Sequence, residues 1–189
     1  MIDPLLSAAA YSHPVHQIRC LETHISWVIL TGDYAYKIKK PVDLGFLDFR
    51  TLEQRRHFCE EELRLNRSWA PRLYLDVVPI VRVGSQVKVG GEGEPIEFAV
   101  RMRQFDQANR LDHLVDNGCL ADNDVVALAE EIARGHSAAR RVGPDGSLLA
   151  TTERLIWENF DQLRGKVPAP FLRKLDAWMR RTLTRYEPL

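Results

Sequence analysis

A short run of lysines contains residues that could hold a phosphate-bearing ligand. The basic residues of the chain are mostly arginine, yet Lys37, Lys39 and Lys40 lie together. Lys37 ends the run Tyr34-Ala35-Tyr36-Lys37, and in a strand Ala35 and Lys37 would point to the same side. The small Ala35 would leave room for a flat base, and Lys37 would reach charged oxygens beside it as a compact point charge.

A lysine in this role needs a carboxylate to hold it, and three consecutive glutamates at 60–62 are candidates. Helical spacing puts Glu62 in the middle of the apolar stripe, Glu61 at its edge and Glu60 on the far side. A carboxylate that faces a core is costly unless it meets a cation. We therefore expect Glu62 to pair with Lys37, with Glu61 as the alternative. The plainer interpretations are an edge-strand lysine and a solvated glutamate.

The elements that must position these residues differ between two parts of the chain. Up to about Phe105 the apolar pattern predicts strands interrupted by one helix, and from about Leu111 it predicts helices. Thr51 and Gln54 form a capping box that starts a helix ending before Pro71. The expected strands are 17–22, 27–31, 34–39, 77–83, 87–89 and 96–102, and the first has the weakest pattern. We expect an α+β fold in which residues 1–104 form one lobe: a short N-terminal helix, then about five antiparallel strands with one helix. The apolar face expected for the main helix comprises Leu52, Phe58, Cys59, Leu63, Leu65 and Trp69.

Residues 105–189 are expected to form a partial helical lobe, with helices near 111–117, 124–141, 152–163 and 171–186. The last helix has an apolar strip with no following element to cover it, so we expect the strip to be either exposed or covered by self-association. The strip comprises Leu172, Leu175, Met179 and Leu183.

The composition excludes several classes of protein. The formal net charge of +0 argues against a dedicated nucleic-acid binder. No apolar run approaches the ~18 residues that span a bilayer. Three widely spaced cysteines suggest neither a disulfide framework nor a zinc site. We expect a cytoplasmic protein.

Lys37 and Glu62 resemble the V-A-I-K lysine and the helix glutamate of the protein-kinase-like superfamily. Longer runs are similar to a bacterial aminoglycoside-phosphotransferase-like family, in which a kinase-like N-terminal region is often fused to a P-loop ATPase domain. The resemblance covers about Leu5 to Leu183. The runs that carry it are Glu22–Val28, Tyr36–Val42, Gly45–Phe49 and Cys59–Arg67.

The resemblance implies that ATP binds this lobe, with magnesium in the intact family member and an unknown small-molecule acceptor. Lys37, Glu62 and Ala35 would contact the nucleotide, and Met102 and Arg103 would belong to a hinge, running to Phe105, whose backbone binds adenine. The loop at 22–26 lacks the glycines that kinases use at the phosphates, so the hydroxyls of Thr23 and Ser26 are expected to substitute for backbone amides.

The H-G-D-x-x-x-x-N catalytic loop and the later metal-binding aspartate of such kinases are absent from this chain. In the family, that loop would begin shortly after Leu189. We therefore assign no catalytic or metal-binding residue. We expect the N-terminal portion of a small-molecule kinase, inactive alone. The alternative is a non-catalytic, degenerate kinase-like module that binds a nucleotide or a protein partner.

Overall fold

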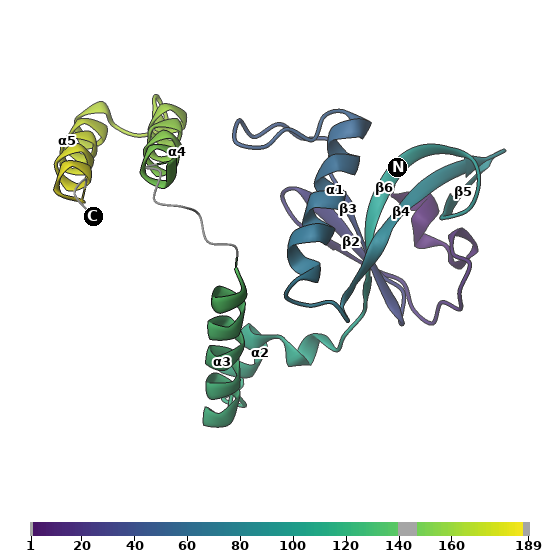
Figure 1. The fold of residues 1–189 in the computed structure, drawn as a ribbon. Helices are drawn as coiled ribbons and strands as arrows, with labels where there is room; N and C mark the ends of the chain where they lie inside the picture. The colour runs from purple at the N-terminus through teal and green to yellow at the C-terminus, as the bar shows by residue number, and fades with distance from the viewer. Residues whose placement is uncertain (1, 140–146, 187–189) are drawn as a thin grey trace. The chain divides into compact units, whose positions relative to one another are not determined.

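The computed structural model describes residues 2–139 and 147–186, which have an α+β fold (Figure 1). The chain divides into two compact units, at 1–133 and 134–189. The first unit contains the whole sheet, the first two α-helices and most of the third, and the second unit contains the end of the third helix and the last two. The helices are α1 (Leu52–Arg67), α2 (Leu111–Asp116), α3 (Asp122–Ala138), α4 (Ser147–Leu163) and α5 (Ala169–Tyr186).

The sheet has six strands in the order β1-β2-β3-β6-β4-β5, and every neighbouring pair is antiparallel. The expected count of five is wrong because β1 pairs with β2 over its whole length. All four residues of β1 are exposed, so backbone hydrogen bonds hold it and its sequence shows no strong alternation. The strands are β1 (Arg19–Glu22), β2 (Ser26–Leu30), β3 (Tyr34–Lys39), β4 (Tyr74–Val83), β5 (Gln86–Val89) and β6 (Glu94–Arg103).

Helix α1 starts at the expected capping box, in which Thr51 and Gln54 bond each other's backbone N–H groups. The helix packs against β4 and β6 (Figure 1). Its buried residues are Arg55 and Cys59. The expected apolar face is therefore wrong in part, because Phe58, Leu65 and Trp69 are exposed.

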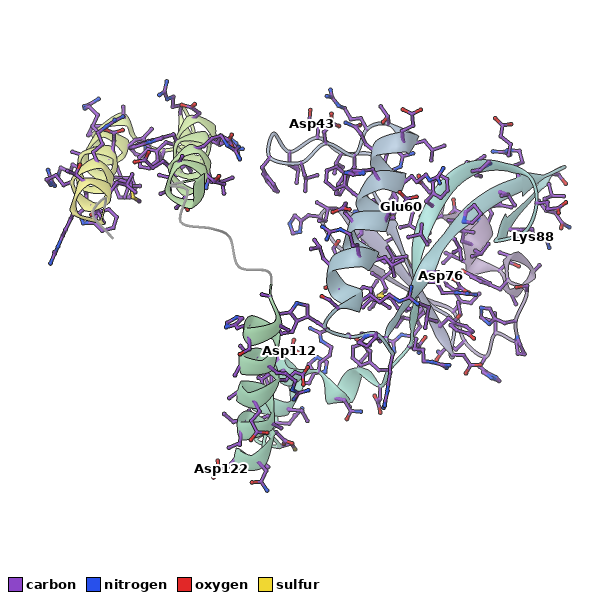
Figure 2. All side chains as sticks on the ribbon, in the orientation of Figure 1. Asp43, Glu60, Asp76, Lys88, Asp112 and Asp122 are labelled. Atoms are coloured by element: carbon purple, nitrogen blue, oxygen red, sulfur yellow. The ribbon has the colours of Figure 1, made fainter. Side chains whose placement is uncertain are left out.

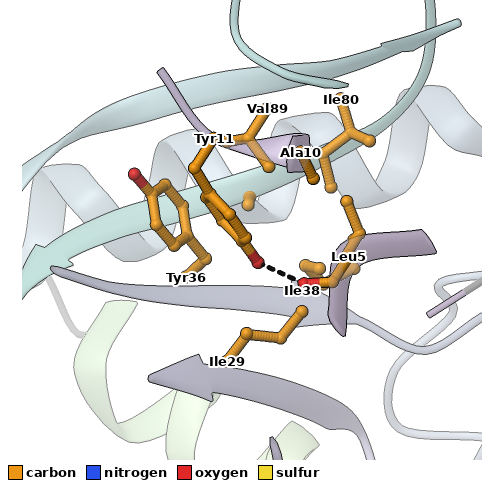
Figure 3. Close-up of a cluster of buried hydrophobic side chains, with 9 residues drawn as sticks. Leu5, Ala10, Tyr11, Ile29, Tyr36, Ile38, Ile80 and Val89 are labelled. Carbon is orange, nitrogen blue, oxygen red and sulfur yellow. Dashed lines mark hydrogen bonds between the residues drawn. The ribbon is translucent and has the colours of Figure 1, made fainter. Parts of the chain in front are cut away.

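The opposite face of the sheet carries the main hydrophobic core (Figure 3). Two 3-10 helices, η1 (Asp3–Leu6) and η2 (Ala8–Ala10), take the place of the expected N-terminal helix. The Tyr11 hydroxyl donates to the carbonyl oxygen of Leu5 at 2.7 Å, which fixes this segment. Tyr36 and Ile38 belong to this core and alternate along β3 with Lys37, so the lysine lies on the α1 face.

The later helices are less buried than the sheet. In the described part of α3 no residue is buried, and the expected end at 140–141 lies outside the described residues. The strip on α5, at Leu172, Leu175, Met179 and Leu183, is half-buried rather than fully exposed. Self-association through it stays a prediction. None of the described helices is both long and apolar enough to cross a membrane.

A buried ion pair joins α1 to β6. The Nε atom of Arg55 donates to both carboxylate oxygens of Glu97, at 2.9 and 2.8 Å, and Nη1 donates to the carbonyl oxygens of Phe49 and Arg50. Glu97 is 0% exposed and Arg55 is 8% exposed. Buried charges persist only when they are paired and hydrogen-bonded, so this pair fixes the first turns of α1 on the sheet.

We predict that Glu97→Gln lowers the free energy of unfolding by about 3–5 kcal/mol, because it leaves the buried Arg55 without its counter-charge. Urea denaturation measures this loss. The matched control is Glu60→Gln, which breaks the exposed pair of Glu60 with Arg56 and should change stability little. Equal effects of the two substitutions would contradict the assignment of Arg55–Glu97 as an anchor.

Candidate functional site

The carboxylate of Glu62 bridges two lysines of β3. Lys37 Nζ donates to Glu62 Oε1 at 2.7 Å, and Lys39 Nζ donates to Oε2 at 2.8 Å. The lysines are two residues apart on one strand, so both point toward α1. The expected pairing of Lys37 with Glu62 is confirmed. Glu61 is not the partner, because its carboxylate bonds Arg64 on the helix surface.

Lys39 was missed as a site residue by the sequence reasoning. The strand period of two that places Ala35 and Lys37 on one side also places Lys39 there. The signal was therefore present in the same run of residues. Lys39 is also the more buried lysine, with a side chain 8% exposed against 29% for Lys37. Its Nζ lies 4.9 Å from the centre of the Phe49 ring.

The electrostatics of the cluster keep Glu62 ionised. Burial alone would raise the pKa of Glu62, but hydrogen bonds from Lys37 and Lys39 outweigh burial and hold the pKa below its ordinary value. Burial raises the pKa of the neighbouring Cys59 thiol to about 12, so Cys59 is neutral and unreactive. Two lysines and one carboxylate leave the cluster with one uncompensated positive charge.

An apolar cavity of about 270 Å³ lies over the same face of the sheet. Val28 is opposite Lys37 in the β2–β3 ladder, and Leu30 is opposite Ala35. The cavity therefore reaches the ladder position of Lys37 and extends along the strands to Ala35, two residues or roughly 7 Å away. Its apolar lining comes from Leu21, Val28, Leu30, Ala35, Leu73, Met102 and Phe105, and its polar lining from Arg103, Gln104, Gln107 and Arg110.

The expected hinge residues Met102 and Arg103 both line this cavity. Two backbone donors of the hinge are already used within the fold. Arg103 N–H donates to the carbonyl of Leu73 at 2.9 Å, and Gln104 N–H donates to that of Asp33 at 3.0 Å. These bonds fasten the end of β6 to the residue that precedes β4 and to the β2–β3 turn. Adenine recognition by the hinge backbone stays a prediction.

The hydroxyls of Thr23 and Ser26 bond each other instead of pointing outward. Thr23 Oγ1 accepts from the backbone N–H of Ser26 at 2.9 Å and lies 2.9 Å from Ser26 Oγ. Ser26 is 1% exposed. The two side chains close the turn between β1 and β2, and their expected contact with phosphate stays a prediction. Across the described ranges, 2–139 and 147–186, no group of three or more His, Cys, Asp or Glu side chains could hold a metal.

Comparison with known proteins gives relatives without an established function. The chain is 36% identical over 171 residues to the uncharacterized protein Rv2004c of Mycobacterium tuberculosis and, equally, to the uncharacterized protein Mb2027c of Mycobacterium bovis. The match covers 87% of this chain and 32% of each relative, so the chain spans about a third of the length of the curated relatives it matches. No protein-family model matches the chain. No solved structure matches it either.

We predict that Glu62 contributes stability that disappears in acid. Its folded pKa is depressed, so the contribution is present above the unfolded glutamate pKa of about 4.3 and is lost as pH falls through the folded value. Thermal unfolding of the native chain and of Glu62→Gln should differ most near pH 7 and converge below about pH 4. Glu60→Gln is the control, and a pH-independent difference for Glu62→Gln would rule out this linkage.

Proposed function

We propose that this chain binds the ATP of a kinase-like phosphotransferase, with the base in the apolar cavity and the phosphates at Lys37. The observation that carries the proposal is the juxtaposition of that cavity with a lysine held by a largely buried glutamate. The resemblance to aminoglycoside-phosphotransferase-like proteins supports the same assignment. The chain would be the nucleotide-binding lobe of such an enzyme.

The cavity has the chemistry that a purine requires. Its floor is built from aliphatic side chains of β2 and β3, with Val28 and Leu30 beside the small Ala35. Aliphatic groups above and below a flat ring bury it without placing polar groups against its faces. Polar side chains at the rim of the cavity, such as Gln107, could fix the orientation of the ring. A volume of about 270 Å³ is at the small end for ligand sites, which suits a base rather than a whole nucleotide.

The lysine lies where the phosphates would follow. Lys37 uses one of its three donors on Glu62, so further donors face the partly exposed side of the cluster. The cluster has a net charge of one positive unit, which favours an anionic group over a neutral one. The relatives are about three times as long as this chain, and the activity of such a longer protein, including its acceptor and any magnesium, is likewise a proposal.

We predict that Lys37→Met removes the preference of the chain for ATP over adenosine. A lost charge-assisted bond to phosphate should weaken ATP binding about tenfold or more, while adenosine, which has no phosphate, should bind as before. Isothermal titration calorimetry with both ligands measures the ratio. Lys88→Met is the control, because Lys88 lies on β5, away from the cluster (Figure 2). Its Nζ donates to the carbonyl oxygen of Ala9. If Lys88→Met also loses the preference for ATP over adenosine, the effect is not specific to Lys37 and its assigned role is wrong.

We predict that Ala35→Leu blocks the binding of both ATP and adenosine. Ala35 lines the cavity, so a larger side chain there would occupy the space assigned to the base. Weakening of at least about tenfold for both ligands is expected, since the base could no longer be buried. Ala108→Leu, at an exposed position outside the cavity, is the matched control. Unchanged adenosine binding by a folded Ala35→Leu variant would place the base elsewhere.

A further inference from the structure

Glu62 has two cationic partners, and the two are not equivalent. Lys39 is almost fully enclosed, between Glu62 and the ring of Phe49, whereas Lys37 retains contact with solvent. Lys39 is also fixed through its backbone, because it is paired with Ser26 at the closed turn between β1 and β2. A buried ammonium group in this position cannot readily turn to a ligand in the cavity.

The distribution of charge gives Lys39 a function. A single lysine paired with Glu62 would be neutral as a pair and would attract phosphate weakly. Lys39 neutralises the carboxylate from the buried side, so the charge of Lys37 remains uncompensated on the open side. Neighbouring charges do not cancel it, because Arg55 is paired with Glu97, Lys40 with Glu22 and Glu61 with Arg64.

We propose that Lys39 is a positioning residue of the nucleotide site. It holds Glu62, and through it α1, against the sheet before any ligand binds, and it leaves the charge of Lys37 free for the phosphates. The second part of this inference rests on the proposed binding of ATP. The first part, the hold on Glu62, is independent of any nucleotide.

The test compares Lys39→Met, Lys39→Arg, Lys37→Met and the control Lys40→Met, which replaces the neighbouring lysine that pairs with Glu22 outside the cluster. Without ligand, Lys39→Met should lower the midpoint of thermal unfolding by about 5 °C or more, and Lys37→Met by less, because the bond of Lys39 is less screened by solvent. At a temperature where every variant is folded, Lys39→Met should reduce the ATP-to-adenosine affinity ratio about tenfold, although Lys37 is intact. Lys39→Arg retains the positive charge, so it should keep most of the ATP-to-adenosine affinity ratio of the native chain.

Each result decides one part of the proposal. A native chain that does not prefer ATP to adenosine would overturn the proposed function, and the thermal measurement would still decide the hold on Glu62. If the native chain shows the preference and Lys39→Met keeps it, the charge role of Lys39 is wrong. If Lys37→Met destabilises the chain as much as Lys39→Met, Lys39 is not the principal hold on Glu62. An effect of Lys40→Met on the ratio equal to that of Lys39→Met would show a general loss of positive charge instead.

Discussion

The bridge from Glu62 to Lys37 and Lys39 is the interaction on which the candidate site depends. It ties the middle of α1 to β3, the strand that also supplies Ala35 to the cavity. A carboxylate can remain ionised between a helix and a sheet only when cations compensate it, and here two do so. The same contact therefore sets the position of the helix, the direction of Lys37 and the net charge beside the cavity.

The rest of the first unit supports that contact from both faces of the sheet. On the α1 side, the Arg55–Glu97 pair fixes the start of the helix, two turns before Glu62. On the other side, the N-terminal segment covers Tyr36 and Ile38, so that face of β3 is packed (Figure 3). A strand held by this core and by two hydrogen-bonded neighbours has little freedom to rotate, and its lysines keep their direction. The site is preorganised by ordinary packing at one helix–sheet interface.

Much of this arrangement could be predicted from local patterns. The capping box at Thr51 marked the start of α1, and strand alternation placed Lys37 beside Ala35. The inner face of α1 could be predicted at Glu62 but not at Arg55, because Arg55 is tolerated there only through Glu97, a partner 42 residues away in sequence. For the same reason, apolar residues such as Phe58 and Leu65, which a hydrophobic stripe would bury, are exposed. Strand β1 is exposed on both sides, so its sequence has no alternation of apolar and polar residues from which to predict it firmly.

The most direct test of the nucleotide site is covalent labelling with an ATP analogue that carries an acyl group on its terminal phosphate. A lysine amine beside the phosphates would attack the acyl carbon, form an amide and release ATP, and mass spectrometry would locate the modified residue. We predict that Lys37 is modified and that excess ATP protects it. Labelling spread over exposed lysines such as Lys166 and Lys174, with no protection by ATP, would contradict the assignment of Lys37 as the phosphate-binding residue.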